Sequence, residues 1–417
     1  MPRFLLPVAL SAFCLLLSLP VSAQLVLGQY EDEAPLGTWN VFGFATAPTL
    51  ALGGARFARA WDLAAGLADP ALLVTLPKSS VTLSASDSRA SMFKYSLVNT
   101  GVVSSDGNLA ANALGLDLGG FAYRWGGWAL AAAAGIIENY GRPGVAVSNG
   151  SATYELDMTQ SGWLRDYHVS AARRITDGFS AGLGLNYVSG NLHRLVVEKT
   201  VEPGGEITIT DAKSEKYSGF FLNGGVAWDL TGSLTAALVF RTPYVKKADA
   251  RSSLRYQAPA GGSDILIEAE ARNEYRQPWV VGAGLSCRFS EVFSAAADLS
   301  FFDWSSYKVT YFGEPLRREF RDVLKAGAGV EYIVSGRLFG RAASFPLRLG
   351  FSVDPQPMAD PRSAYYSLHA GAGFRLPFLA VDLAGAFGRE TGSGNSLSAG
   401  KVVLSATYIF DRSGRGR

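Results

Sequence analysis

The sequence has little cysteine and histidine. Of its two cysteines, Cys14 lies in an apolar N-terminal segment that is expected to be removed, which leaves Cys287 without a partner for an internal disulfide. The three histidines, His168, His193 and His369, lie far apart and lack the spacing of metal ligands. These absences exclude a fold stapled by disulfides. They also give no reason to expect a metal or any other cofactor.

Catalytic motifs and an excess of one charge are also missing. The 38 basic residues nearly balance the 36 acidic ones, so no basic surplus is available for nucleic acid. The chain contains no GxSxG, HExxH or CxxC pattern and no phosphate-binding glycine loop. Asp62 and Asp69 stand seven positions apart without a base or metal partner, so they support no mechanism. We expect a protein that is neither an enzyme nor a nucleic-acid binder.

The N-terminus has the composition of a secretory signal peptide. Arg3 supplies a positive charge, an apolar run follows from Phe4 to Leu19, and Val21-Ser22-Ala23 is a small-residue cleavage site. Residues 1–23 are therefore predicted to be removed, and Gln24 begins the mature chain.

The mature chain is apolar overall but has no segment long enough to span a membrane as a helix. Its mean hydropathy is positive, at +0.13 for the whole sequence. The longest apolar run, Gly126–Ile137, has twelve residues, whereas a spanning helix needs about 18. A closed β-barrel is the other structure that satisfies every backbone polar group in lipid. The sequence therefore predicts an all-β transmembrane antiparallel barrel in the bacterial outer membrane.

Segments of alternating hydrophobicity recur from residue 79 to residue 410. Six short connections rich in Gly, Asp and Pro alternate with seven longer polar ones, and the longest of these are 139–162, 197–213 and 251–271. Short turns on one side, long loops on the other and an even number of strands are typical of bacterial barrels. We expect fourteen strands, near 79–99, 115–125, 127–138, 163–175, 178–196, 214–229, 232–250, 272–289, 292–312, 320–333, 345–354, 364–376, 378–389 and 398–410.

The last strand shows the alternation most clearly. Val402, Leu404 and Tyr408 share one face, while Lys401 and Ser405 lie on the other. This pattern places lipid outside and a wetter lumen inside. We expect the barrel-assembly machinery to engage this C-terminal strand, and residues 411–417 to form a short charged tail. Aromatic residues at the short turns predict a periplasmic girdle, formed by Trp125, Trp128, Trp228, Phe289, Phe293 and Phe378.

Residues 24–78 precede the first strand and are rich in Ala, Gly and Leu. A barrel of fourteen strands encloses a lumen wider than its own side chains fill. We therefore expect residues 24–78 to form a plug, with a short helix that carries Leu63 and Leu67 on one face. The alternative is a periplasmic extension.

The chain resembles the FadL-type family of outer-membrane long-chain fatty-acid transporters, which also contains hydrocarbon channels. Near the N-terminus, the glycine-alanine stretch from Gly53 is followed by Asp69-Pro70-Ala71, where the family has Asn-Pro-Ala. The C-terminal part carries further matching motifs in the family's order, namely Asp303-Trp304-Ser305, 324–332, 347–357 and 371–375. Asp69 departs from the family's Asn, which puts any role of that amide in doubt.

The resemblance implies passive uptake of hydrophobic small molecules, such as fatty acids or hydrocarbons, in contact with outer-membrane lipid. It implies sideways exit through a kinked strand, for which Gly135 in the small-residue stretch from Ala131 is the candidate. A plain strand at this place is the alternative. The resemblance also implies a hatch or gate, formed by Gly53, Gly54, Asp62, Asp69, Pro70 and Ala71. It further implies a loop motif, formed by Asp354, Pro355 and Pro357.

Two other functions remain open from the sequence. A general porin for polar solutes requires charged rings that face an open lumen. The inward faces are expected to be small and weakly charged, which argues against a porin. A barrel that serves in secretion or anchoring instead of transport would favour unusually large external loops, and the loops expected here are moderate.

Overall fold

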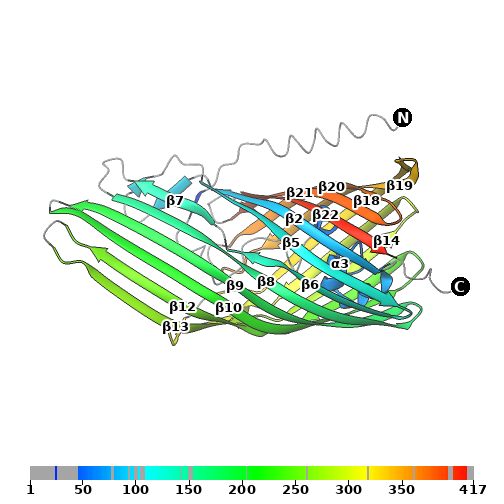
Figure 1. Ribbon diagram of the computed structural model, residues 1–417, viewed down its shortest axis with the longest axis horizontal. Coiled ribbons are helices and arrows are strands. Elements are labelled where there is room, and N and C mark those ends of the chain that lie inside the picture. The colour runs from blue at the N-terminus through cyan, green and yellow to red at the C-terminus, as the bar shows by residue number, and fades with distance from the viewer. Residues whose placement is uncertain are drawn as a thin grey trace.

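The computed structural model is a closed antiparallel β-barrel of fourteen strands that surrounds an N-terminal helical segment (Figure 1). The expected fold class is confirmed. The predicted signal peptide, the stretch 26–45 of the expected plug and the tail 411–417 lie outside the described residues. The structure describes residues 24–25, 46–76, 79–92, 94–97, 102–103, 109–140, 142–148, 154–202, 204–259, 262–316, 319–359, 362–392 and 398–410.

Nineteen strand segments make up the fourteen barrel strands, because several strands are divided into two segments. Consecutive barrel strands pair with each other, and the last strand pairs with the first, from Ser79↔Phe410 to Ser91↔Ser398. A separate small sheet consists of β1 (Gln24–Leu25), β3 (Lys94–Leu97) and β4 (Val102–Val103). The barrel consists of β2 (Ser79–Met92), β5 (Leu109–Trp125), β6 (Trp128–Asn139), β7 (Arg142–Ser148), β8 (Tyr154–Thr176), β9 (Phe179–Glu202), β10 (Gly205–Asp229), β11 (Leu234–Arg241), β12 (Tyr244–Gln257), β13 (Ile265–Gln277), β14 (Val280–Arg288), β15 (Phe293–Phe302), β16 (Lys308–Tyr311), β17 (Glu314–Leu316), β18 (Val323–Leu338), β19 (Arg341–Pro355), β20 (Ala364–Arg375), β21 (Leu379–Thr391) and β22 (Ser398–Phe410).

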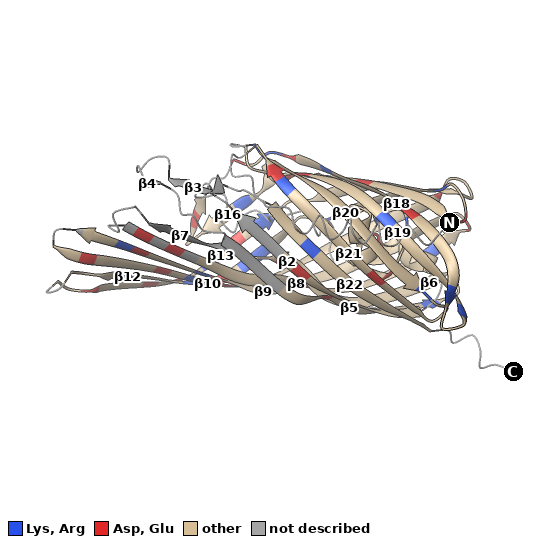
Figure 2. Ribbon diagram, turned by 90° about the horizontal axis from the view of Figure 1, so that it is seen from above, with Lys and Arg blue, Asp and Glu red and all other residues tan. Residues whose placement is uncertain are grey.

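The predicted loops 139–162, 197–213 and 251–271 are largely strand. The strands β8, β9 and β10 are 23, 24 and 25 residues long, whereas a tilted strand crosses a bilayer in about 9–11 residues. Together with β12 and β13 they project beyond the rest of the barrel (Figure 1). Ion pairs such as Arg251–Glu270, at 2.9 Å, link neighbouring projecting strands. Figure 2 shows charged residues of both signs along this projection.

The predicted strands 320–333 and 345–354 left residues 334–344 as a turn, and this prediction is wrong. There β18 and β19 remain paired as far as Leu338↔Arg341. Only Phe339 and Gly340 form the turn, both with positive φ, at 50° and 77°.

The barrel has an apolar outer surface and a polar inner one. In β2, Val81 and Leu83 are exposed, whereas Thr82, Ser84 and Ser86 are buried. This distribution is the reverse of that in a water-soluble protein and fits a wall in contact with lipid. Five aromatic residues at the tight turns are exposed, as a girdle requires: Trp125, Trp128, Trp228, Phe289 and Phe293. None of the described helices is long and apolar enough to cross a membrane.

Residues 46–76 fill one part of the lumen. They contain α2 (Ala47–Ala51), α3 (Leu63–Ala68) and the 3₁₀-helix η1 (Pro70–Thr75). The helix α2 packs against β19 to β22, α3 against β2 and β5, and η1 against β5, β6 and β8 to β10. The leucines of the expected helix, Leu63 and Leu67, are both buried within α3. We call residues 46–76 the lumen segment.

Candidate functional site

Glycines of the barrel wall let the backbone of the lumen segment approach closely. A Cβ atom at Gly329 of β18 would lie 2.6 Å from the Cα of Leu52, and one at Gly182 of β9 would lie 2.6 Å from the nitrogen of Ala71. The ladder at Gly329 has no register shift, and the missing side chain makes room for the lumen segment.

The first predicted hatch residues form the turn that follows α2. Gly53 and Gly54 both have positive φ, at 69° and 87°, a conformation that glycine adopts without steric cost. The nitrogen of Gly54 donates to the carbonyl of Thr49, 2.9 Å away. This turn directs the chain along β18 and β19, where a Cβ at Gly53 would lie 2.8 Å from the carbonyl oxygen of Ala328.

Asp62 joins the two helices of the lumen segment. One carboxylate oxygen accepts a hydrogen bond from the hydroxyl of Thr46 at 2.6 Å, and the other accepts one from the nitrogen of Ala64 at 2.9 Å. Thr46 is the N-cap of α2, and Ala64 lies in the first turn of α3. Asp62 therefore holds the helices together.

Asp69 caps η1, which begins with Pro70 and Ala71. Its Oδ1 accepts a hydrogen bond from the nitrogen of Ala71 at 2.9 Å, while its Oδ2 is buried without a hydrogen-bond partner among the described residues. Glycine at position 225 of β10 leaves space for this carboxyl group. Burial raises the pKa of Asp69 from 3.8 to about 8. The raised pKa favours the neutral form of Asp69, at the position where the FadL-type family has the neutral side chain of Asn.

We predict that Asp69→Asn stabilises the folded protein in a pH-dependent way. The raised pKa means that the folded state favours the neutral acid, so ionisation destabilises the wild type as pH rises from about 4 to about 8. The two proteins should have similar stability near pH 4. Near pH 8 the free energy of unfolding of the variant should exceed that of the wild type by a few kcal/mol, because each pKa unit corresponds to about 1.4 kcal/mol. Urea unfolding in detergent at several pH values measures this difference, and a pH-independent difference would contradict it.

A buried ionic cluster ties the lumen segment to β18, β19 and β21. The guanidinium of Arg348 donates to Glu331 at 2.8 Å and to Asp382 at 2.6 Å. Arg59 of the lumen segment lies 3.6 Å from Glu331 and stacks 3.8 Å from the ring centroid of Trp61. The expectation of a weakly charged inner wall is therefore wrong. Charged side chains are present on this wall and are paired across strands.

Two other polar links hold the lumen segment on different sides of the wall. Asp298 of β15 accepts hydrogen bonds from the backbone nitrogens of Arg56 and Phe57. On the other side, His168 bonds to Asn186, which donates to Asn223. The Asn223 side chain then donates to the carbonyl of Leu67 at 3.0 Å. The segment is thus fixed to the barrel rather than loosely placed in it.

The wall itself is interrupted beside Gly135. The pairs between β5 and β6 run from Trp125↔Trp128 to Leu118↔Gly135, and no later pair joins β5 to β6 or β7 among the described residues. The sheet is irregular on both flanks, with register shifts in the β2–β5 and β6–β8 ladders. We call the stretch beyond the last β5–β6 ladder pair, between residues 109–117 on one side and residues 136–140 and 142–148 on the other, the β5–β6 seam.

The described part of this seam contains small and apolar side chains together with Asp117 and Glu138, which are paired with Lys401 and Lys246. A Cβ atom at Gly115 would lie 3.4 Å from Cδ1 of Ile136, so the strands stay close beyond the end of their ladder. Leu114 and Leu116 are exposed on the outer face beside them. Lipid and lumen are separated here by side chains rather than by a hydrogen-bonded ladder.

Directly after β6, Tyr140 turns into the lumen. Its nitrogen donates to the carbonyl of Gly162, and its hydroxyl donates to Glu138 at 2.6 Å. Lys246 of β12 donates to the same hydroxyl at 2.8 Å, and its ammonium lies within 5.3 Å of the ring centroids of Tyr140, Tyr217 and Tyr275. Tyr140 therefore connects the end of β6 with the opposite wall.

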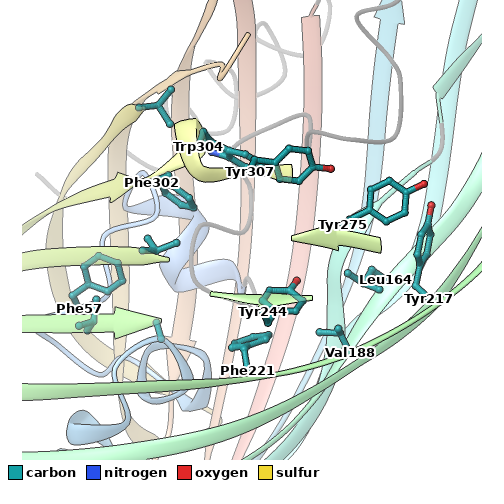
Figure 3. Packing of buried hydrophobic residues seen from close by; sticks show 14 of the residues in the cluster. Phe57, Leu164, Val188, Tyr217, Phe221, Tyr244, Tyr275, Phe302, Trp304 and Tyr307 are labelled. Atoms are coloured by element: carbon teal, nitrogen blue, oxygen red, sulfur yellow. The ribbon is translucent and has the colours of Figure 1, made fainter. Parts of the chain in front are cut away.

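Aromatic rings continue from this cluster toward the lumen segment. Figure 3 shows Tyr217, Phe221, Tyr244, Phe302 and Tyr307 pointing into the interior from separate strands and loops. All belong to one buried hydrophobic cluster that also includes Phe57 of the lumen segment. The interior beside the seam is therefore rich in aromatic side chains.

The predicted site residues fall in three places. The hatch residues all lie in the lumen segment. Gly135 lies where the β5–β6 ladder ends and the seam begins. Asp354 lies on β19, where its buried carboxylate is 2.6 Å from the ammonium of Lys325. The following loop is bonded to its neighbour, because Pro357 accepts from the nitrogen of Arg321 at 2.8 Å. Within the described part of the chain, Asp354, Pro355 and Pro357 form no hydrogen bond or ion pair with the hatch residues.

Sequence reasoning missed the ionic cluster and Tyr140. Glu331 and Arg348 each stand between outward apolar residues, which is the signal for an inward charge. Their mutual contact depends on register across two strands, which the sequence does not display. The described residues contain no group of His, Cys, Asp and Glu that could hold a metal ion.

The chain matches no family model and no curated protein. Among solved structures it is similar to a FadL homologue of Pseudomonas aeruginosa, with 16% identity, a TM-score of 0.64, and 91% of this chain and 100% of that chain covered. It is also similar to the toluene transporter TbuX of Ralstonia pickettii, with 18% identity, a TM-score of 0.62, and 90% of this chain and 100% of that chain covered. The toluene transporter TodX of Pseudomonas putida is similar with 13% identity and a TM-score of 0.63, and the match covers 90% of this chain and 100% of that chain. These likenesses show a shared barrel fold.

Proposed function

We propose that this protein is an outer-membrane channel for the passive uptake of hydrophobic compounds, a class that includes long-chain fatty acids and hydrocarbons. The solute enters from the projecting end of the barrel. It contacts the aromatic interior and leaves sideways into lipid through the β5–β6 seam. In this proposal the hatch residues of the lumen segment close the direct path to the periplasm.

The filled lumen supports a channel without an open aqueous pore. The lumen segment contacts β2, β5, β6, β8 to β10 and β19 to β22, and its bonds to Asp298, Asn223 and Glu331 fix it. A general porin for polar solutes needs an open, charged constriction instead. The buried ion pairs here cross-link the wall and the lumen segment.

The seam at Gly135 is the observation that carries the proposal. An apolar solute gains about 25 cal/mol for each Å² of surface removed from water, so it follows an apolar route into lipid in preference to an aqueous one. A wall with a complete ladder would require hydrogen bonds to break before any solute could pass. Beyond Leu118↔Gly135 no β5–β6 ladder pair stands in the way of a solute that passes beside Gly115.

Cross-linking the seam tests this proposal. Cysteines at Gly115 and Ile136, in a Cys287→Ser background, should form a disulfide under oxidation and reduce uptake of a radiolabelled hydrophobic tracer by cells. Reduction should restore uptake. The matched control places cysteines at Ala122 and Ala131, which are already paired in the same two strands. Unchanged uptake with the seam cross-link formed would refute the sideways route, and equal loss in both pairs would show a nonspecific effect.

A further inference from the structure

Basic side chains mark the edge of the apolar outer wall on one side of the barrel. The segments β10, β12, β13 and β16 pair in this order, and the first three run side by side in Figure 1. On each of them, the first exposed charge between the apolar wall and the projecting end is basic. These residues, which we call the outer basic cluster, are Lys216, Lys247, Arg276 and Lys308.

The position of the cluster matches the outer boundary of the hydrocarbon layer. In β10, residues 217–227, eleven in all, separate Lys216 from the exposed Trp228 at the short-turn end. A tilted strand crosses the hydrocarbon core in about 9–11 residues. Beside the cluster, Trp279 packs against Phe301 with ring centroids 5.4 Å apart. Aromatic side chains gather at membrane interfaces, so the cluster stands at the level of the lipid headgroups.

The cluster keeps its positive charge, because none of its members forms an ion pair within the described part of the chain. Two outward acids stand opposite it in the ladders, Asp249 opposite Lys216 and Glu274 opposite Lys247. Asp249 is bonded to Arg272 at 3.1 Å. Glu274 therefore remains as the acid that offsets the four cations, which leaves a net charge of +3. Other basic residues of the same strands are paired, namely Lys213 with Glu215, Lys246 with Glu138 and Arg251 with Glu270.

The register of the ladders groups the cations into two pairs. Arg276 and Lys308 stand directly opposite each other in β13 and β16, a position at which like charges destabilise a sheet. Lys216 and Lys247 are diagonal neighbours, because Lys247 opposes Ser218. An anion between the members of a pair offsets their repulsion. A guanidinium binds phosphate through two hydrogen bonds and an ammonium binds it as a point charge, so each pair suits one phosphate group.

We propose that the outer basic cluster binds the phosphate groups of a doubly phosphorylated lipid of the outer leaflet, of the lipid A type. This inference rests on the outer-membrane location in the proposed function. The cluster faces outward at headgroup level, where the anions within reach belong to neighbouring lipids and not to a solute in the lumen. Two cation pairs match two phosphates. The acyl chains of the same lipid pack on the apolar wall, where Phe220 and Leu222 are exposed.

A matched pair of lipids tests the inference. The purified full chain in detergent should bind diphosphorylated lipid A more tightly than the same lipid without its phosphates, by about tenfold or more, which corresponds to about 1.4 kcal/mol or more. Native mass spectrometry of a lipid titration measures both affinities. Equal affinities would overturn the inference, because acyl chains alone would then account for binding. Inorganic phosphate at the concentration of the lipid should leave the lipid bound, and its displacement would assign the cluster to free phosphate and overturn the lipid site.

A double variant tests the residues. Arg276→Gln combined with Lys308→Gln should lower the affinity for diphosphorylated lipid A by about tenfold and leave that for the dephosphorylated lipid unchanged. The matched control, Arg251→Gln combined with Arg255→Gln, removes the same charge from exposed side chains farther along β12 and should change neither affinity. Unchanged binding in the first variant, or equal losses in both, would overturn the inference.

The outcome is independent of the channel proposal. The cluster lies on β10, β12, β13 and β16, away from the β5–β6 seam and on the opposite face of the wall from the lumen. Failure of the lipid test would therefore leave the sideways route intact. Unchanged uptake with the seam cross-linked would in turn refute that route and leave the lipid site standing.

Discussion

Replacing residues 46–76 with a short Gly/Ser linker should turn a barrel without steady ion conductance into one with large, stable conductance steps. The lumen segment fills space that fourteen strands leave open, and its contacts reach most of the wall. Without it, water and ions can pass straight through the lumen. Planar-bilayer recording of purified wild type and variant measures the change directly.

The control for this deletion is the barrel itself. The strand ladder closes through β2 and β22 independently of the lumen segment, so heat-modifiable mobility in gels should persist in the variant. A folded variant that remains silent would contradict the role of residues 46–76 as the ion barrier. A wild type with large, steady conductance would contradict it equally.

Arg348→Met should destabilise the folded barrel by about 3–5 kcal/mol, because it leaves buried carboxylates without their closest cation. Arg348 has no exposed side-chain surface, and its guanidinium contacts Glu331 and Asp382 on two different strands. Methionine matches much of the volume but supplies neither charge nor hydrogen bonds. Equilibrium urea unfolding in detergent micelles measures the loss.

The matched control is Arg251→Met on the projecting strands. Arg251 also forms an ion pair, with Glu270, but both side chains are more than two-thirds exposed. Exposed pairs contribute about 0–1 kcal/mol, so this variant should unfold almost as the wild type does. Equal losses in the two variants would show that burial of the ionic cluster has no special importance.

The barrel could be predicted from the sequence because lipid imposes a strong period-two pattern. Leu299 and Asp298 of β15 face opposite sides, as the alternation indicated. The pattern fails where both faces of a strand meet water. For that reason β9 and β10 extend through stretches that the sequence presents as polar loops.

The site was predictable only in part. Gly135 was singled out by its small neighbours, and the β5–β6 ladder indeed ends there, although the role of that break in transport remains a prediction. Tyr140 carried no signal, because its contact with Lys246 joins positions 106 residues apart. The interior charges stand at inward positions of the alternation, but sequence reasoning missed them, and their pairing depends on the register of several strands.

Photolabelling is the most direct test of sideways transport. A diazirine-bearing hydrocarbon is added to outer-membrane vesicles that contain the protein, irradiated during uptake, and located by peptide mass spectrometry. Sideways exit predicts labels at both borders of the seam, within residues 114–118 and residues 136–140. These labels should be lost when the seam is cross-linked. Labels confined to the lumen segment and the periplasmic turns, with none at the seam, would contradict the proposed route.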